Sequence, residues 1–288
     1  MEAFSDMIAL FKLNAKIYNN AQFCGNWQVN EHALGQTCFH LVTVGDCIMH
    51  ISNEQPIHLF RGDLVIFPRE TEHRLCPNEQ SVAEMEKRAI DPHAQGTGLL
   101  CGQLIFEHHA FDSVLDLLPN IVVIKNEHAP WLAPLLMQIE YESVNRQSGS
   151  DAILNRLAEL LFVYALRHIL QNQTDLSFLG LYVSNSLKAA IQLIHQQPHT
   201  ALPLDKLAEA CSMSRTVFAQ TFKANSGWTP AQYITWWRMQ LAWGKLEQGE
   251  RISLVATDVG YQSEAAFSRV FKKIFGMSPG RVRGKSLA

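Results

Sequence analysis

The segment that decides the fold of the last third of the chain is Val259-Gly-Tyr-Gln-Ser-Glu-Ala-Ala-Phe-Ser-Arg-Val-Phe-Lys-Lys-Ile-Phe-Gly-Met-Ser-Pro279. Gly260 supplies the backbone freedom that a tight corner needs, and the Ser263 hydroxyl suits the N-cap of a following helix. Helical spacing of the apolar residues predicts one buried face. That face comprises Phe267, Val270, Phe271, Ile274 and Phe275. With a short helix predicted at Ile252–Ala256, the segment is typical of a helix-turn-helix unit.

The same pattern occurs about 50 residues earlier. Leu204, Leu207, Ala208 and Cys211 have the spacing of a short helix, and Ser214 is the expected N-cap of a second helix. The inward residues of that second helix are Val217, Phe218, Thr221 and Phe222. Between the two units, Thr229-Pro230-Ala231-Gln232 predicts a capping box at the start of a long spacer helix. Such a spacer would hold the second helix of each unit, here called a reader, about 34 Å from the other, in successive major grooves of DNA.

The charge of the chain is divided unevenly. Residues 184–288 contain 13 Lys and Arg against six Asp and Glu, a net charge of +7, whereas residues 1–183 contain 11 against 21, a net charge of −10. A basic C-terminal third favours a polyanion partner such as nucleic acid. A helical bundle with an unevenly charged surface is the alternative, but two capped basic units in tandem favour double-stranded DNA.

Residues 184–284 resemble the DNA-binding domain of AraC/XylS-type transcription regulators, on the two units and the segment quoted first. The resemblance implies base-facing positions at Thr216, Ala219, Gln220, Ala265, Ala266 and Arg269. It places phosphate contacts at Ser214, Arg215, Lys223, Ser263, Lys272 and Lys273. The alanines can only touch a thymine methyl group, so Arg269 is the expected guanine reader.

The first half of the chain has a different pattern. From Cys24 to Phe106, short β-prone runs alternate with turns, which predicts an antiparallel barrel or sandwich. Residues 130–170 then carry two apolar helical stripes, expected to form a dimer interface or to cover the core. The predicted fold class is α+β, with an antiparallel barrel and helices followed by an all-α domain. The expected divisions are a sensor barrel at 1–127, a helical segment at 128–170, a linker at 171–182 and a DNA-binding domain at 183–288.

Residues 5–125 resemble the cupin-type sensor of a subgroup of AraC-like regulators. The match rests on Phe39-His40 and on Gly62-Asp-Leu-Val-Ile-Phe-Pro68 followed by His73. The usual first cupin motif, two His one residue apart and a Glu, is absent except for His40. The closest subgroup responds to reactive chlorine and related oxidants, and its sensing cysteines match Cys24 and Cys101. Oxidation of an activated thiolate would be a reversible signal.

A metal site is a second hypothesis for the sensor. Cys24, His40, His73 and Cys101 would offer two sulfur and two nitrogen ligands, a set that suits Zn²⁺ or Cu(I). Two alternatives remain open, namely buried structural thiols with satisfied histidines, and an organic effector in the barrel. The other cysteines are predicted to be structural. They are Cys38, Cys47, Cys76 and Cys211.

These patterns together predict a sequence-specific transcription regulator, an activator, that senses an oxidant through cysteines. The expected partners are promoter DNA, RNA polymerase and a second copy of the chain. No enzymatic activity is expected; the other function classes are a metal-dependent cupin enzyme and a structural nucleoid binder. No uninterrupted run of 18 apolar residues occurs, and Glu2 and Asp6 precede or interrupt the first apolar run, which argues against a signal peptide and for a cytoplasmic protein.

Overall fold

The structure is a computed structural model that describes residues 3–31, 36–69, 71–77, 86–106, 115, 118–172 and 177–285. The chain divides into two units. Among the described residues, those between Leu13 and Ile169 form the first unit, and those of Met1–Lys12 and Leu170–Ala288 form the second. The helical segment predicted at 128–170 thus falls with the strands, and the first 12 residues fall with the C-terminal helices. Part of the predicted linker, 173–176, lies outside the described residues.

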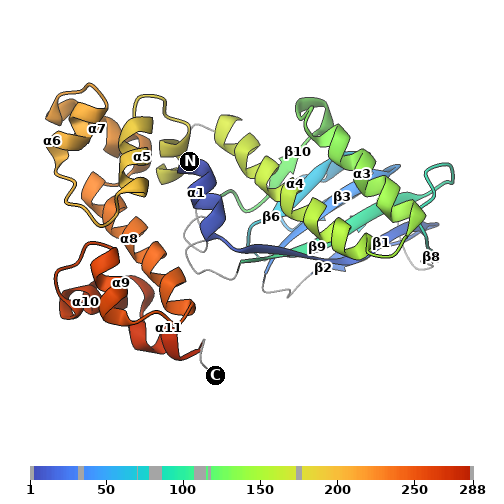
Figure 1. Cartoon of the computed structure of the whole chain (residues 1–288). Coiled ribbons are helices and arrows are strands. Elements are labelled where there is room, and N and C mark those ends of the chain that lie inside the picture. The colour runs from blue at the N-terminus through green and yellow to red at the C-terminus, as the bar shows by residue number, and fades with distance from the viewer. Residues whose placement is uncertain are drawn as a thin grey trace. The chain divides into compact units, whose positions relative to one another are not determined.

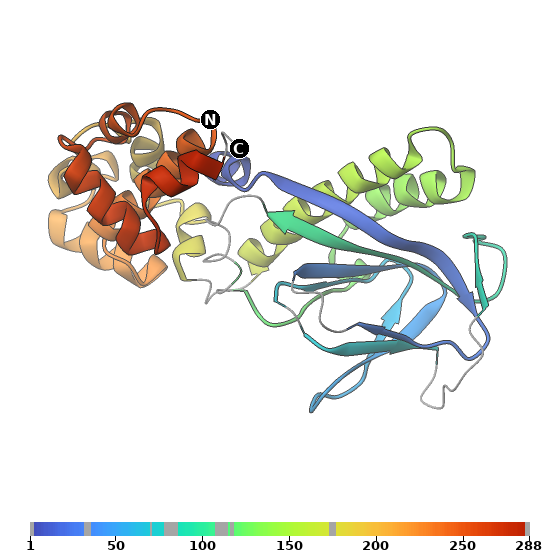
Figure 2. The ribbon, with the colours of Figure 1, turned by 90° about the horizontal axis from the view of Figure 1, so that it is seen from below.

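The first unit contains two antiparallel sheets (Figures 1 and 2). The six-stranded sheet has the order β10-β6-β3-β9-β1-β8. Its strands are β1 (Leu13–Cys24), β3 (Thr37–Val44), β6 (Leu64–Phe67), β8 (Glu86–Arg88), β9 (Thr97–Phe106) and β10 (Val122–Ile124). The second sheet has the order β2-β7-β4-β5, with β2 (Val29–Glu31), β4 (Asp46–Ile51), β5 (Ile57–Phe60) and β7 (His73–Cys76). The predicted mixture of sheet and helix is confirmed, but the described strands form two ladders instead of one closed barrel.

The core of this unit lies between the two sheets. Strand residues alternate in direction, so Cys38 and Val42 of β3 enter the core together with Leu99 and Cys101 of β9. All eight residues of β3 are buried. This is the pattern of a strand covered on both faces, because helices cover the opposite face of the same sheet.

The covering helices are α3 (Leu132–Asn145) and α4 (Ser150–Asn172), which lie along the six-stranded sheet in Figure 1. The β1 backbone donates hydrogen bonds to α4, from Ile17 N to Asn155 Oδ1 at 3.0 Å and from Ala15 N to Glu159 Oε1 at 3.3 Å. A short 3-10 helix, η2 (Asn126–His128), connects β10 to α3. The two predicted helical stripes therefore do cover the core, yet part of each helix remains apolar and exposed. The exposed apolar residues are Met137, Tyr141, Val144, Ile153 and Leu160.

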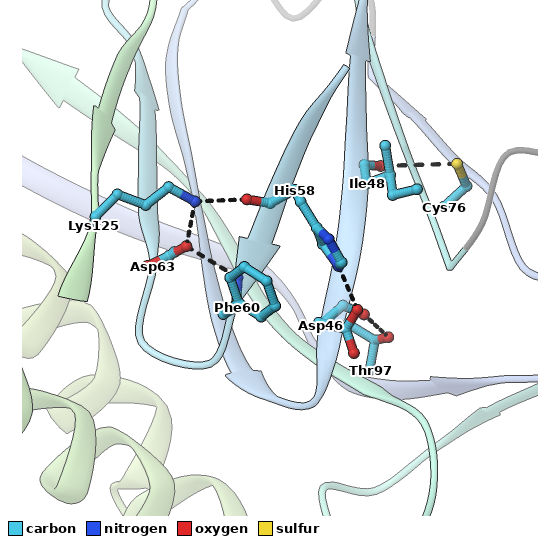
Figure 3. Close-up of polar contacts among 8 residues, drawn as sticks. All are labelled: Asp46, Ile48, His58, Phe60, Asp63, Cys76, Thr97 and Lys125. Carbon is cyan, nitrogen blue, oxygen red and sulfur yellow. Dashed lines mark hydrogen bonds and ion pairs between the residues drawn. The ribbon is translucent and has the colours of Figure 1, made fainter. Parts of the chain in front are cut away.

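A buried carboxylate fixes the turn before β6 (Figure 3). Asp63 accepts hydrogen bonds from the backbone N–H of Phe60 and of Asn126, both at 3.0 Å, and from Lys125 Nζ at 2.7 Å. Lys125 also reaches the His58 carbonyl at 2.5 Å. Because these groups belong to β5, to the β5–β6 turn and to the segment after β10, Asp63 joins strands of both sheets.

The second unit consists of helices. They are α1 (Ala3–Leu10), η3 (Ser177–Tyr182), α5 (Lys188–Gln196), α6 (Leu204–Ala210), α7 (Arg215–Ser226), α8 (Pro230–Glu247), α9 (Ile252–Asp258), α10 (Glu264–Phe275) and α11 (Pro279–Lys285). The predicted signals for helix ends are confirmed. Ser214 and Ser263 accept bonds from first-turn amides, and Thr229 forms a capping box with Gln232.

Helix α1 packs in this second unit. Met7 is fully buried, the Asp6 carboxylate lies 3.5 Å from His195 Nδ1 of α5, and Lys12 Nζ forms an ion pair with Glu247 of α8 at 3.1 Å. The sequence pattern predicted that residues 1–12 belong to the sensor barrel at 1–127. Position along the chain does not show which core an amphipathic helix joins, so only the tertiary packing reveals this assignment.

We predict that Asp63→Asn destabilises the first unit by about 1.5–3 kcal/mol, because hydrogen bonds to a charged group are worth about that much. The substitution preserves the shape of the side chain but removes the charge that holds Lys125. Urea unfolding followed by circular dichroism measures the effect. Glu127→Gln is the control, because its carboxylate is largely exposed and should matter by less than about 0.5 kcal/mol. Equal stability of the two variants would contradict the anchoring role of Asp63.

Candidate nucleic-acid interface and sensor site

The first predicted reader is α7, which follows α6 after a turn. Phe218 and Phe222 are fully buried and anchor its inner face. The predicted base-facing residues Thr216 and Gln220 are exposed, and Ala219 is half-buried. Of the predicted phosphate contacts in this unit, Ser214, Arg215 and Lys223 are all exposed. Helix α7 thus presents a polar and basic face to solvent, as a major-groove helix requires.

The second predicted reader, α10, repeats this arrangement. Phe267 and Phe271 are fully buried, whereas Ala265 and Arg269 are exposed and Ala266 is half-buried. The remaining predicted phosphate contacts are also exposed. They are Ser263, Lys272 and Lys273.

The buried stripe of each reader is narrower than predicted. Val217 of α7 is 48 % exposed and Ile274 of α10 is 38 % exposed, although both were expected to face inward. Each stripe is anchored by one pair of phenylalanines four residues apart, because these short helices pack within their units on one side only. Helical periodicity identifies the direction of a buried face but not its width.

Helix α8 connects the two helix-turn-helix units and contributes to both cores. Near its N-terminus, Trp237 stacks on His195 of α5 with ring centroids 3.5 Å apart. Near its C-terminus, Trp243 stacks on Phe271 of α10 at 5.8 Å. Burial lowers the pKa of His195 to about 3, so this ring is neutral when it accepts or donates at Tyr233 Oη, 2.8 Å from Nε2. The predicted rigid spacer is therefore packed at both ends.

The turn of the second helix-turn-helix unit, at Gly260, also contacts the segment before the first helix-turn-helix unit. Gly260 has a φ of +84°, and a Cβ atom there would lie 2.9 Å from the His199 carbonyl oxygen. Arg238 of α8 donates a hydrogen bond to the neighbouring Thr200 carbonyl at 2.8 Å. The glycine predicted for a tight corner thus has a second role, because only a residue without a side chain permits this close approach.

One predicted phosphate contact already has a partner. Arg215 Nε lies 3.5 Å from Asp205 Oδ1, and both side chains are mostly exposed. An exposed ion pair of this kind contributes little and is readily exchanged for another anion. The pair is therefore compatible with a phosphate-binding role for Arg215.

In the first unit, the structure brings together two of the four predicted metal ligands. His40 on β3 and His73 on β7 face each other across the core, with their Nε2 atoms 2.6 Å apart. Burial lowers the pKa of both imidazoles, and for His40 the neighbouring His73 lowers it further. Both rings are therefore neutral near pH 7, which is the form that binds metals.

Cys38, which was predicted to be structural, completes this cluster. The potential ligand atoms of Cys38, His40 and His73 all lie within 4.8 Å of one another, and all three residues are buried. The signal was present in the sequence, because residues two apart on a strand point to the same face. Cys38 and His40 are such a pair, although the usual cupin motif has two histidines and no cysteine.

Cys101 and Cys24 lie differently. Cys101 is fully buried, is directly opposite His40 in the β3–β9 ladder, and accepts a hydrogen bond from Asn19 Nδ2 at 3.7 Å. Cys24 is at the end of β1, is partly exposed, and its Sγ lies 3.4 Å from the Gln95 carbonyl. Asn19 pairs with Cys101 and Phe23 with Thr97, so Cys24 and Cys101 are about 15 Å apart along the ladder. The four predicted ligands do not converge at one point.

Three other free cysteines, Cys47, Cys76 and Cys211, differ from Cys24 and Cys101 in their surroundings. Cys47 is fully buried, and burial raises the pKa of its thiol to about 12. Burial also raises the pKa of Cys211, which is partly exposed in the C-terminal unit. Cys76 is buried, and its thiol lies 3.8 Å from the Ile48 carbonyl (Figure 3). A thiol that stays protonated is a poor nucleophile and a poor metal ligand, so Cys47 and Cys211 suit structural positions.

Comparison with known proteins agrees with this architecture. A family model described as Cupin matches residues 2–171, and one described as Helix-turn-helix domain matches residues 207–285. A putative AraC-like transcription regulator of Streptomyces lividans is 30 % identical over 298 residues, with 98 % of each chain covered. The RCS-specific HTH-type transcriptional activator RclR of Escherichia coli K12 is 28 % identical, covering 98 % of this chain and 97 % of that protein. An uncharacterized HTH-type transcriptional regulator of Haemophilus influenzae is also 28 % identical, over 98 % of both chains.

None of the helices that the structure describes is both long enough and apolar enough to cross a membrane.

We predict that Arg269→Ala abolishes protection of discrete DNA sites and leaves the thermal unfolding midpoint unchanged, because the side chain is exposed. A bidentate contact to guanine is worth about 1–3 kcal/mol of discrimination. Selection of bound fragments from genomic DNA, followed by footprinting, measures the loss. Arg269→Lys should also lose discrimination, since lysine keeps the charge but not the planar fork.

Lys272→Ala is the contrasting variant. It should weaken binding to all sequences alike and reduce the slope of log affinity against log salt by about 1. An unchanged footprint in Arg269→Ala would remove that residue from base reading.

Proposed function

Because this chain belongs to the AraC-like transcription regulators, with an N-terminal cupin domain and a C-terminal helix-turn-helix domain, we propose that it binds specific promoter sites under the control of its cupin domain. The observation that carries the proposal is the pair of capped helices, α7 and α10, with polar faces exposed and with α8 packed against both units. In this proposal the two helices enter successive major grooves of one duplex.

Exposure and side-chain chemistry support the base-reading assignment that the resemblance implies. Thr216, Gln220 and Arg269 have exposed hydrogen-bonding side chains at the predicted positions. Ala219, Ala265 and Ala266 offer only methyl groups, so they suit contacts with thymine methyls. The phosphate contacts proposed above would then determine affinity and its salt dependence. RNA polymerase is the proposed protein partner, with activation as the outcome, and the cytoplasm as the place where both act.

We further propose that the cupin domain responds to an oxidant through Cys101 and Cys24. The Asn19 amide that donates to the Cys101 sulfur stabilises negative charge there, and the nucleophilic form of cysteine is the thiolate. Cys24 is the more accessible of the two. Their separation exceeds the roughly 7 Å Cα distance that a disulfide allows. Oxidation of each thiol on its own, first to the sulfenic acid, therefore fits the geometry better than a bond between them.

Two observations favour this chemistry over an organic effector held between the sheets. Large buried side chains already fill that space, among them Phe23, Trp27 and Phe67. In addition, a relative of nearly the same length is named RCS-specific. The relatives named above are regulators, which supports a non-enzymatic role.

We predict that hypochlorite changes the expression of a promoter reporter controlled by the wild-type protein, and that Cys101→Ala removes the response. Cys24→Ala should reduce it, whereas Cys47→Ala, which removes a thiol with a raised pKa, should not change it. Mass spectrometry of the treated protein identifies the modified thiols in the same samples. A full response in Cys101→Ala would place the sensor at another residue.

A dimer is proposed through the exposed apolar residues of α3 and α4. Met137, Tyr141 and Val144 recur along one side of α3, and Ile153 and Leu160 are seven residues apart on α4. An exposed stripe shared by two adjacent helices is the usual form of a self-association surface in soluble proteins. A homodimer would place two copies of the DNA-binding domain on one promoter.

We predict that Leu160→Glu converts the dimer to a monomer, because a charge in an apolar interface loses its hydration without gaining a partner. Analytical ultracentrifugation measures the change. Ala152→Glu adds the same charge on α4 outside the stripe and should leave the dimer intact. A monomeric wild-type protein would contradict the proposal.

A further inference from the structure

The buried cluster of Cys38, His40 and His73 has a feature that the proposed oxidant sensing does not use. It joins the two sheets of the cupin domain, because Cys38 and His40 lie on β3 of the six-stranded sheet and His73 opens β7 of the second sheet. The exposed fractions of the three residues are 2 %, 0 % and 3 %. Three potential ligand groups thus meet beside the apolar core cluster between the two sheets.

The two imidazoles share one proton between their Nε2 atoms, at the point where a metal ion would fit. His73 Nδ1 lies 2.7 Å from the Thr71 carbonyl oxygen, so Nδ1 must carry its proton and the Nε2 of the neutral ring is a bare lone pair. His40 Nε2 faces that lone pair at 2.6 Å and must supply the shared proton, and His40 Nδ1 is buried without a hydrogen-bond partner. When the shared proton moves to His40 Nδ1, both rings stay neutral and both Nε2 atoms offer a lone pair to a cation.

The surroundings match those of a built metal site. A ligating histidine usually donates its other N–H to a carbonyl, which fixes the ring, and the Thr71 carbonyl does this for His73. Phe67 stacks on the His73 ring with centroids 3.9 Å apart and holds its orientation. With metal–nitrogen bonds of about 2.0 Å at about 120° to each other, the two Nε2 atoms would move to about 3.5 Å apart. That change is small for two opposed rings.

The ion also has a path to the cluster. His73 lines a polar hollow of about 570 Å³ on the second sheet, together with His50, Glu72 and Arg74. The site is therefore buried by its neighbours but adjoins a hollow that solvent can enter. A metal site needs such an entry path as well as suitable ligands.

We propose that Cys38 Sγ, His40 Nε2 and His73 Nε2 hold one copper(I) ion. The ligand set is one soft thiolate and two imidazoles, and trigonal sites of two histidines and one cysteine are characteristic of copper. A structural zinc site almost always has four protein ligands, whereas this cluster offers three among the residues that the structure describes. This set replaces the metal site predicted from the sequence, which combined Cys24, His40, His73 and Cys101. The proposal rests on the proposed function only in assuming that the cupin domain is a sensor.

Copper binding would connect β3 to β7 and so join the two sheets at a point where they now share a single hydrogen bond between imidazoles. Binding to the folded state alone raises thermal stability in proportion to the logarithm of ion concentration over dissociation constant. Cys101 is directly opposite His40 in the β3–β9 ladder, and Cys38 lies two residues before His40 on β3. The proposed ion thus lies beside the thiol assigned to oxidant sensing, where its presence changes the electrostatic surroundings of that sulfur.

The test titrates the full-length protein with copper(I) under anaerobic, reducing conditions against a chromophoric copper(I) chelator. We expect one ion per chain, a higher thermal unfolding midpoint, and an X-ray absorption spectrum with one sulfur and two nitrogen neighbours. Cys38→Ser, His40→Gln and His73→Gln should each weaken binding by about 100-fold or more, since loss of an outer partner alone costs 10–100-fold. Cys76→Ser and Cys101→Ser should retain copper.

Several outcomes would overturn the assignment. They are the absence of copper uptake by the folded wild-type protein, equal affinity in Cys38→Ser, a loss in Cys101→Ser with retention in Cys38→Ser, and preferential binding of zinc over copper. The absorption spectrum of the wild-type protein decides the ligand set even if a core variant does not fold. Footprinting of the same samples separates the two proposals. Discrete sites without copper uptake contradict only the metal site, and copper uptake without discrete sites contradicts only the proposed function.

Discussion

The spacer helix α8 is the element on which the DNA-binding unit depends. It has 18 residues, and nine of them are buried because its two ends belong to different cores. Tyr233 and Trp237 pack with α5 and α7, whereas Trp243 and Leu246 pack in the core of α9 and α10. A helix held at both ends cannot bend without exposing aromatic surface. The separation of the two readers is therefore set by packing and not by linker length.

The contact of α8 with the rest of its unit extends to the start of the chain. Helix α1 adds Met7 to the core, and Lys12 pairs with Glu247 at the far end of α8. The strand β1 begins at Leu13, directly after this pair. Within the described part of the chain, the backbone passes between the DNA-binding unit and the cupin unit at Lys12–Leu13 and at Ile169–Leu170. A change in β1 or in α4 has a short covalent path to the readers.

In the cupin unit, buried polar groups specify how the two sheets meet. Asp63 orders the turn before β6 through two backbone amides and Lys125, and the cluster of Cys38, His40 and His73 joins β3 to β7. Apolar packing alone tolerates small shifts between sheets, whereas hydrogen bonds and ligand geometry do not. The cluster that joins the two sheets is therefore also the one proposed to hold copper.

The sequence by itself determined the features that depend on neighbours along the chain. The caps at Ser214, Thr229 and Ser263, the corner at Gly260 and the outward positions of Thr216 and Arg269 all follow from local hydrogen bonding and helical period. Only the tertiary structure decided which distant residues meet. It brought His73 to the strand pair Cys38 and His40, separated Cys24 from Cys101, and assigned α1 to the C-terminal unit. These outcomes depend on strand register and on competition between cores, and both are settled by the packing of the whole chain because no local pattern encodes them.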